Sequence, residues 1–119
     1  MPGSRLAAYD IIPNQVQSIY VCNVDICTTA SVNFVNRSAS PRKVQLAVTA
    51  TQNQISATDF LIADLEIPPQ SSITKEGIIL SPTEYITVFA EESAVNAVAW
   101  GVTAGSVISV PPIQDNTGA

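Results

Sequence analysis

Paired carboxylates are the first candidates for chemistry in this sequence. Asp64 and Glu66 are two residues apart in a segment of alternating hydrophobicity, so a β-strand places both side chains on one face. Two carboxylates on one face can serve as acid and base in glycoside hydrolysis, or can ligate calcium. Asp59 precedes them, but the closely spaced Asp, Asn and Gly residues of a calcium loop are missing. The pattern therefore favours a solvated strand face, and we predict no metal site here.

The remaining reactive side chains do not form a recognisable catalytic set. The sequence has no histidine, so it lacks every Ser-His-Asp or Cys-His triad. The spacing of Cys22 and Cys27 is wrong for a Cys-x-x-Cys redox pair, and a zinc site needs further soft ligands. The two cysteines can face each other across a short turn as a disulfide, but a reducing compartment favours two small buried apolar residues. Scattered glycines form no phosphate-binding loop. We predict a protein that is not an enzyme and has no catalytic residues, cofactor or small-molecule substrate.

The charge distribution argues against nucleic acid as a partner. The net charge is −5, and among the 5 basic residues only Arg37, Arg42 and Lys43 lie close together in the sequence. Neutralising phosphates requires a basic stripe, which one cluster does not provide. We interpret the cluster as a solvated hairpin turn.

The chain has no sequence signal for a membrane or for secretion. Its apolar runs are far shorter than the ~18 residues of a membrane span, and the N-terminus lacks the apolar core of a signal peptide. We expect a protein made in the cytoplasm, with no membrane partner. The N-glycosylation acceptor pattern Asn36-Arg37-Ser38 is then without consequence.

Strands are the elements that position all of these side chains. Apolar residues recur with a period of two, most clearly where Val44, Leu46 and Val48 alternate with polar or small neighbours in residues 43–50. Pro68-Pro69 and Pro82 end strands, because proline has no N–H for the ladder. Further strands are predicted over residues 6–12, 16–23, 30–36, 60–67, 72–80, 84–90 and 94–103.

This spacing predicts an all-β protein. Seven or eight strands about 8–12 residues apart are typical of a single antiparallel β-sandwich, jelly-roll or immunoglobulin-like. The length of 119 residues suits one domain, which we place at residues 1–105, with extended terminal arms. The aromatic residues fall about one to a strand, as a core would use them, and we expect Trp100 between the sheets.

Residues 106–119 form the predicted C-terminal arm. The segment is too poor in apolar residues to pack by itself, and the alternatives are a frayed end or an arm that lies along a neighbouring subunit. The candidate subunit contacts are apolar residues and prolines: Ile108, Val110, Pro111, Pro112 and Ile113.

Composition favours assembly with other proteins. Hydrophobic residues make up 46% of the sequence and charged residues 13%, about half the usual share. A surface with few charges has little of the repulsion that keeps monomers apart. We therefore expect a homo-oligomer.

Residues 20–101 resemble a recurrent small β-sandwich of tailed-phage virion proteins. The resemblance rests on the order of short motifs over about two thirds of the chain: Asn36-Arg37-Ser38, Val44-Gln45-Leu46-Ala47-Val48, Ile67-Pro68, Gly77-Ile78-Ile79-Leu80, Ile86-Thr87-Val88-Phe89-Ala90 and Val98-Ala99-Trp100-Gly101. It implies a non-enzymatic virion component: a capsid decoration or cement protein bound to itself and to other virion proteins, such as the major capsid or tail proteins. A neck, tail or baseplate accessory protein is the alternative. The longer loop at residues 23–27 and the C-terminal arm depart from the pattern.

Two other classes of protein remain open. A carbohydrate- or receptor-binding module requires exposed aromatic side chains. A small enzyme built on Asp64 and Glu66 requires a pocket with perturbed carboxylates.

Overall fold

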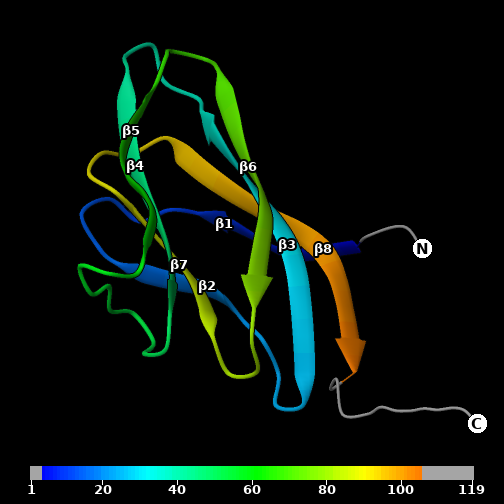
Figure 1. Ribbon diagram of the computed structural model, residues 1–119. Helices are drawn as coiled ribbons and strands as arrows, with labels where there is room; N and C mark the ends of the chain where they lie inside the picture. Colours follow the sequence, from blue (N-terminus) through cyan, green and yellow to red (C-terminus); the bar gives the residue numbers. More distant parts are fainter. Residues whose placement is uncertain (1–3, 106–119) are drawn as a thin grey trace, which may run out of the picture.

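Eight strands follow one another along residues 4–105, the part of the chain that the computed structural model describes (Figure 1). No helix interrupts them within that range. Their bounds are β1 Ser4–Asp10, β2 Gln17–Val21, β3 Ile26–Asn36, β4 Arg42–Thr49, β5 Phe60–Ile67, β6 Ser72–Leu80, β7 Tyr85–Ala90 and β8 Val95–Gly105. The strands confirm the predicted elements, with β3 beginning four residues earlier than expected.

The strands form two four-stranded antiparallel sheets packed as a sandwich. Sheet A has the order β1-β8-β3-β6 and sheet B the order β2-β7-β4-β5. The pairs β4·β5, β3·β6, β2·β7 and β1·β8 are nested, as in one long hairpin folded over itself. Only β4 and β5 are consecutive neighbours in one sheet, so every other connection crosses between the sheets. This is the jelly-roll arrangement, which settles the choice against an immunoglobulin-like order.

Alternation along the strands builds the core between the sheets. In β3, Ala30, Val32 and Phe34 are buried, while the residues between them face outward and are partly exposed. The same alternation in β4 and β8 brings short and branched apolar side chains to the inner faces. The core is made mainly by Ile11, Phe34, Val44, Leu46, Ile67, Ile78, Leu80, Ile86, Val88, Val95, Ala97 and Ala99.

Every edge strand of the sandwich contains an irregularity. The edge strands β1, β2, β5 and β6 each hold extra residues relative to the central strand they pair with. The central pairs β3·β8 and β4·β7 run without a shift. In β6 the irregularity includes Gly77, whose φ of 72° is easily adopted only without a side chain. Bulges of this kind disturb the edge for further strand pairing.

The expectation that Trp100 lies between the sheets is wrong. Val95, Ala97 and Ala99 occupy the inward positions of β8, so the alternation turns Trp100 to the outer face of sheet A, where it is 37% exposed. Among the aromatic residues only Phe34 is fully buried, and Tyr9 is also exposed. Phe34 and Tyr20 thus pack in or against the core, whereas Tyr9 and Trp100 are exposed.

Candidate protein-binding surface

The outer face of sheet A combines exposed apolar side chains with an absence of charge along its two central strands. Neither β3 nor β8 contains an Asp, Glu, Lys or Arg residue. Solvent-facing strands normally place polar and charged residues outward. We call the outward side chains of these two strands the β3–β8 face: Cys27, Thr29, Ser31, Asn33, Val35, Asn96, Val98, Trp100, Val102 and Ala104.

Trp100 lies near the middle of this face. Its cross-strand neighbours are Ser31 on β3 and Arg5 on β1, so a small hydroxyl side chain is next to it on one strand and a charged side chain on the other. Indole is the side chain most often found at the energetic centre of protein interfaces. An exposed tryptophan on an uncharged strand pair therefore marks the centre of the candidate surface.

A second apolar group adjoins the tryptophan. Thr29 pairs with Val102 on one side and with Ile79 of β6 on the other. Val102 is 40% exposed and Ile79 is 71% exposed, with the short Thr29 side chain between them. The face thus alternates large apolar and small polar side chains, as a surface that interdigitates with a partner would.

Gly101 fixes β8 closely against β3. A Cβ atom at this position would lie 2.1 Å from the carbonyl oxygen of Thr29 and 2.8 Å from the Cα of Ala30. Only glycine permits this approach. The glycine that follows Trp100 therefore permits the close approach of the two central strands at this point.

The outer face of sheet B has a different chemical character. Lys43 Nζ lies 3.8 Å from Asp64 Oδ2, with both side chains about half exposed, and Glu66 is opposite Lys43 in the ladder. Asp64 and Glu66 thus lie on a charged, solvent-exposed strand face. Within residues 4–105 no group of three or more His, Cys, Asp or Glu side chains is arranged to hold a metal ion.

Residues 50–59, which join β4 to β5, cover part of sheet B. Ala47 and Thr87 are outward by register, yet both are fully buried. Asn53 of the loop bonds to Ser18 on β2, and the Thr49 hydroxyl donates to the carbonyl of Thr51. Sheet B is thereby partly covered by its own chain, whereas the β3–β8 face is covered by none of the described residues.

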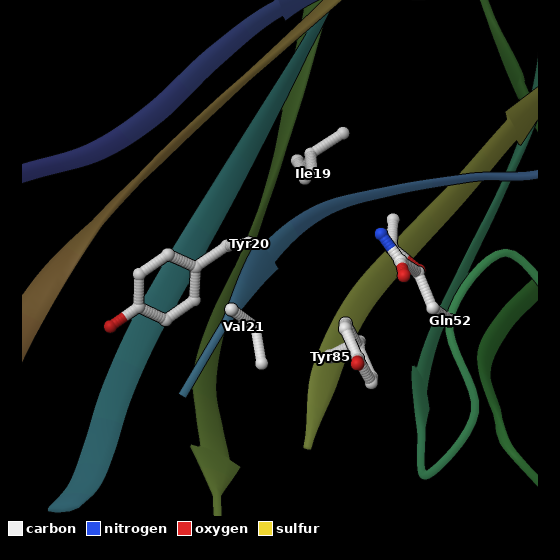
Figure 2. A pocket seen from close by; sticks show the side chains of 6 residues that line it. Ile19, Tyr20, Val21, Gln52 and Tyr85 are labelled. Carbon is white, nitrogen blue, oxygen red and sulfur yellow. The ribbon is translucent and has the colours of Figure 1, made fainter. Parts of the chain in front are cut away.

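A hollow of about 360 Å³ lies beside β2, at the margin of this loop. Figure 2 shows Val21, Tyr85 and Gln52 on one side of β2, while Tyr20 points the opposite way, toward β3. The Tyr20 hydroxyl is 3.4 Å from the Thr28 hydroxyl in the core. A tyrosine ring and an amide on an open hollow can stack on and hydrogen-bond to a small polar ligand.

The basic cluster of the β3–β4 turn is paired with acids. Arg37 Nη2 lies 2.6 Å from Asp10 Oδ1, and Arg42 Nη1 lies 3.1 Å from Glu92 Oε1. With the pair of Lys43 and Asp64, each of the three bases has an acidic partner. The turn therefore presents no concentrated positive charge.

The two cysteines are free thiols. Cys22 is fully buried, and its Sγ–H donates to the carbonyl of Ile26 at 2.9 Å. Cys27 is partly exposed on the β3–β8 face, so the expectation that both are buried holds for Cys22 alone.

Asn36 is a structural residue. It is fully buried, and its Nδ2 donates to the carbonyl oxygens of Ser40, Ile67 and Pro68 at 2.8, 3.0 and 3.1 Å. Its Oδ1 accepts from the N–H and hydroxyl of Ser38 at 2.9 and 2.7 Å. The amide holds the β3–β4 and β5–β6 turns together, so the glycosylation motif has no accessible acceptor nitrogen in the folded domain.

The candidate contacts of the C-terminal arm, Ile108, Val110, Pro111, Pro112 and Ile113, lie outside the described residues. The same range, 4–105, holds no helical segment long and apolar enough to cross a bilayer.

Comparison with known proteins finds no family model, no curated protein and no solved structure that matches this chain. Its function must therefore be inferred from the fold and the surface.

Proposed function

We propose that this protein is a non-enzymatic structural subunit of a tailed-phage virion, acting as a capsid decoration or cement protein. Its role would be mechanical: a rigid sandwich presents the β3–β8 face to protein subunits and buries it in the assembled particle. The arm residues Ile108, Val110, Pro111, Pro112 and Ile113 add contacts to neighbouring subunits. The protein would be made in the host cytoplasm and function in the virion.

The uncharged β3–β8 face with its exposed Trp100 is the observation that carries this proposal. The centres of protein interfaces are depleted of charged residues and enriched in aromatic ones. Contiguous exposed apolar surface on a soluble domain indicates a site of interaction. The contrast with sheet B, where Lys43 and Asp64 form an exposed ion pair, supports the choice of face.

The fold supports the assignment to a virion only as an analogy. Jelly rolls recur in viral capsid proteins, but also in lectins and in other proteins. The order of motifs that resembles phage sandwich proteins is the feature that favours the virion among these.

Counting copies in purified particles tests the proposal. Quantitative mass spectrometry would compare this chain with the major capsid protein. A ratio near one, or a simple fraction of one, supports a decoration protein spread over the shell. A few dozen copies or fewer would place the protein in the neck, tail or baseplate instead. Absence from the particles would contradict a virion role.

A carbohydrate- or receptor-binding module is the second candidate. It is favoured by the outward position of Trp100 and by the hollow beside Tyr85 and Gln52. Its test is binding of soluble glycans, measured by calorimetry, with Tyr85→Ala and Trp100→Ala as separate variants. Loss of glycan binding in either variant would support this function, and no binding by the unaltered protein would exclude the glycans tested.

A further inference from the structure

We infer that the β3–β8 face binds a second copy of this chain, face to face across a two-fold axis that passes near Trp100. The inference rests on the proposed role of this face as a protein interface, and it goes further by naming the occupant. Four observations support it: the irregular edge strands, the absence of charge on β3 and β8, the pattern of large and small side chains, and the area of the sheet.

The edge strands do not favour association through added strands. Each of β1, β2, β5 and β6 carries extra residues that disturb its ladder. On β2 the side chain of Asn53 also accepts a hydrogen bond from the Ser18 N–H at 2.8 Å. Such bulges and covers are the features by which sheets avoid edge-to-edge pairing. Two copies therefore meet most readily through a sheet face.

Charge favours a second copy on this face over a charged partner. Each chain carries a net charge of −5, so two copies repel at most orientations. The strands β3 and β8 have no charged side chain, so the two chains can approach there with the charges of sheet A, among them Arg5 opposite Trp100, at the margin of the contact. A partner with a charged face would lose its hydration and find no counter-charge on these strands.

The side-chain pattern of the face is self-complementary. Large groups at Trp100, Val102 and Ile79 lie beside the small side chains of Ser31 and Thr29. A two-fold axis parallel to the strands and midway between β3 and β8 places Trp100 of one copy over Ser31 of the other, and Val102 over Thr29. This is the interdigitation required of isologous interfaces and of sheets packed face to face.

The area of the outer face of sheet A approaches that of a stable dimer interface. Sheet A has 4 strands, and its central strands have 11 residues each. At about 4.8 Å between strands and about 3.3 Å per residue, the β3–β8 face measures roughly 350 Å². With β1 of 7 residues and β6 of 9 residues, the whole outer face of sheet A measures roughly 600 Å². Stable interfaces bury about 800 Å² on each partner. The whole outer face of sheet A therefore provides about three quarters of that area, with the charged residues of β1 and β6 at its margins.

The indole of Trp100 is the chain's only one, so its fluorescence reports directly on this face. Sedimentation velocity and tryptophan emission would be measured on the full chain from about 0.1 to 100 µM, a range that covers the weaker interfaces of this size. We expect a monomer–dimer transition, with emission moving to shorter wavelength and acrylamide quenching falling over the same concentrations. If the indole becomes buried only when the dimer forms, the β3–β8 face is the contact between the two copies.

Two variants of equal exposure separate this face from the rest of the surface. Ile79→Arg places a charge on β6 directly beside the β3–β8 face, at a side chain that is 71% exposed, so the monomer fold tolerates it. Val24→Arg is the matched control, because Val24 is 67% exposed in the turn between β2 and β3. We expect Ile79→Arg to raise the dimer Kd at least about tenfold, and Val24→Arg to change it less than about twofold.

Three results would overturn the inference: a monomer at every concentration, a dimer in which Trp100 stays open to quencher, or a dimer weakened equally by both variants. A monomer whose Trp100 becomes buried only on isolated capsids would assign the face to a different protein. The copy number in particles is measured separately. The virion role can therefore be contradicted while the dimer is confirmed, and the dimer can be contradicted while the virion role is confirmed.

Discussion

Ser18 and Asn53 exchange two hydrogen bonds between an edge strand and the loop that covers its sheet. The Ser18 N–H donates to Asn53 Oδ1, and the Asn53 N–H donates to Ser18 Oγ, both at 2.8 Å. The Thr87 hydroxyl lies 2.8 Å from that of Ser18 and 2.9 Å from that of Thr49, which donates to the Thr51 carbonyl. Because each hydroxyl has one proton, donation runs in one direction, from Asn53 through Ser18, Thr87 and Thr49 to Thr51.

Ser18→Ala breaks this chain at its exposed end. The Asn53 N–H loses its acceptor and Thr87 its donor, so we expect the free energy of unfolding to fall by about 1–2 kcal/mol. Urea denaturation measures the loss, and amide exchange should quicken in residues 50–59. Ser93→Ala, at an exposed serine in the β7–β8 turn, is the control and should change little. Equal effects of the two variants would show that the chain of hydroxyls does not anchor the loop.

Asn36→Ala should be among the most destabilising polar substitutions. It removes a buried amide and leaves the carbonyls of Ser40, Ile67 and Pro68 without their donor. We expect a loss of about 2–4 kcal/mol in urea denaturation. Asn33→Ala is the control on the same strand, since Asn33 is partly exposed and accepts one hydrogen bond from Thr74. A loss below about 1 kcal/mol for Asn36→Ala would contradict its role in joining the turns.

Substituting Gly101 and Gly77 should separate crowding from backbone strain. Gly101→Ala forces a methyl group against the Thr29 carbonyl at 2.1 Å, so we expect a loss of about 2–3 kcal/mol. Gly77→Ala has open space but a φ of 72°, and we expect about 1 kcal/mol. Thermal unfolding of both variants tests the order. If Gly77→Ala lowers the free energy of unfolding more than Gly101→Ala does, crowding against β3 is not the reason for a glycine at position 101.

Truncation after Gly105 tests the C-terminal arm. β8 ends at Gly105, so all eight strands remain and we expect the free energy of unfolding to change by less than about 0.5 kcal/mol. Attachment to particles should weaken, because Ile108, Val110 and Ile113 are lost from the proposed contacts. Cosedimentation with particles that lack the protein measures this. If the truncated protein attaches to particles as well as the full chain does, the arm does not contribute to the contact.

The surface proposed here was only partly readable in the sequence. The sequence alone shows that residues 26–36 and 95–105 contain no charged side chain. What the sequence does not show is that these two segments are neighbours, since more than fifty residues separate them and long-range pairing joins them. The sequence predicts Trp100 inside, because the aromatic residues fall about one to a strand, as a core would use them.

The sequence by itself determined that there are seven or eight strands, their positions to within about four residues, and the class of fold, because a period of two and the turn residues are local properties. The tertiary structure decided the jelly-roll order, the bulged edges and the outward side of Trp100. Alternation defines two faces of a strand but not which one is buried, and a shift of one residue in register exchanges them. That choice is made by the partner strands, through ladders that link distant parts of the chain.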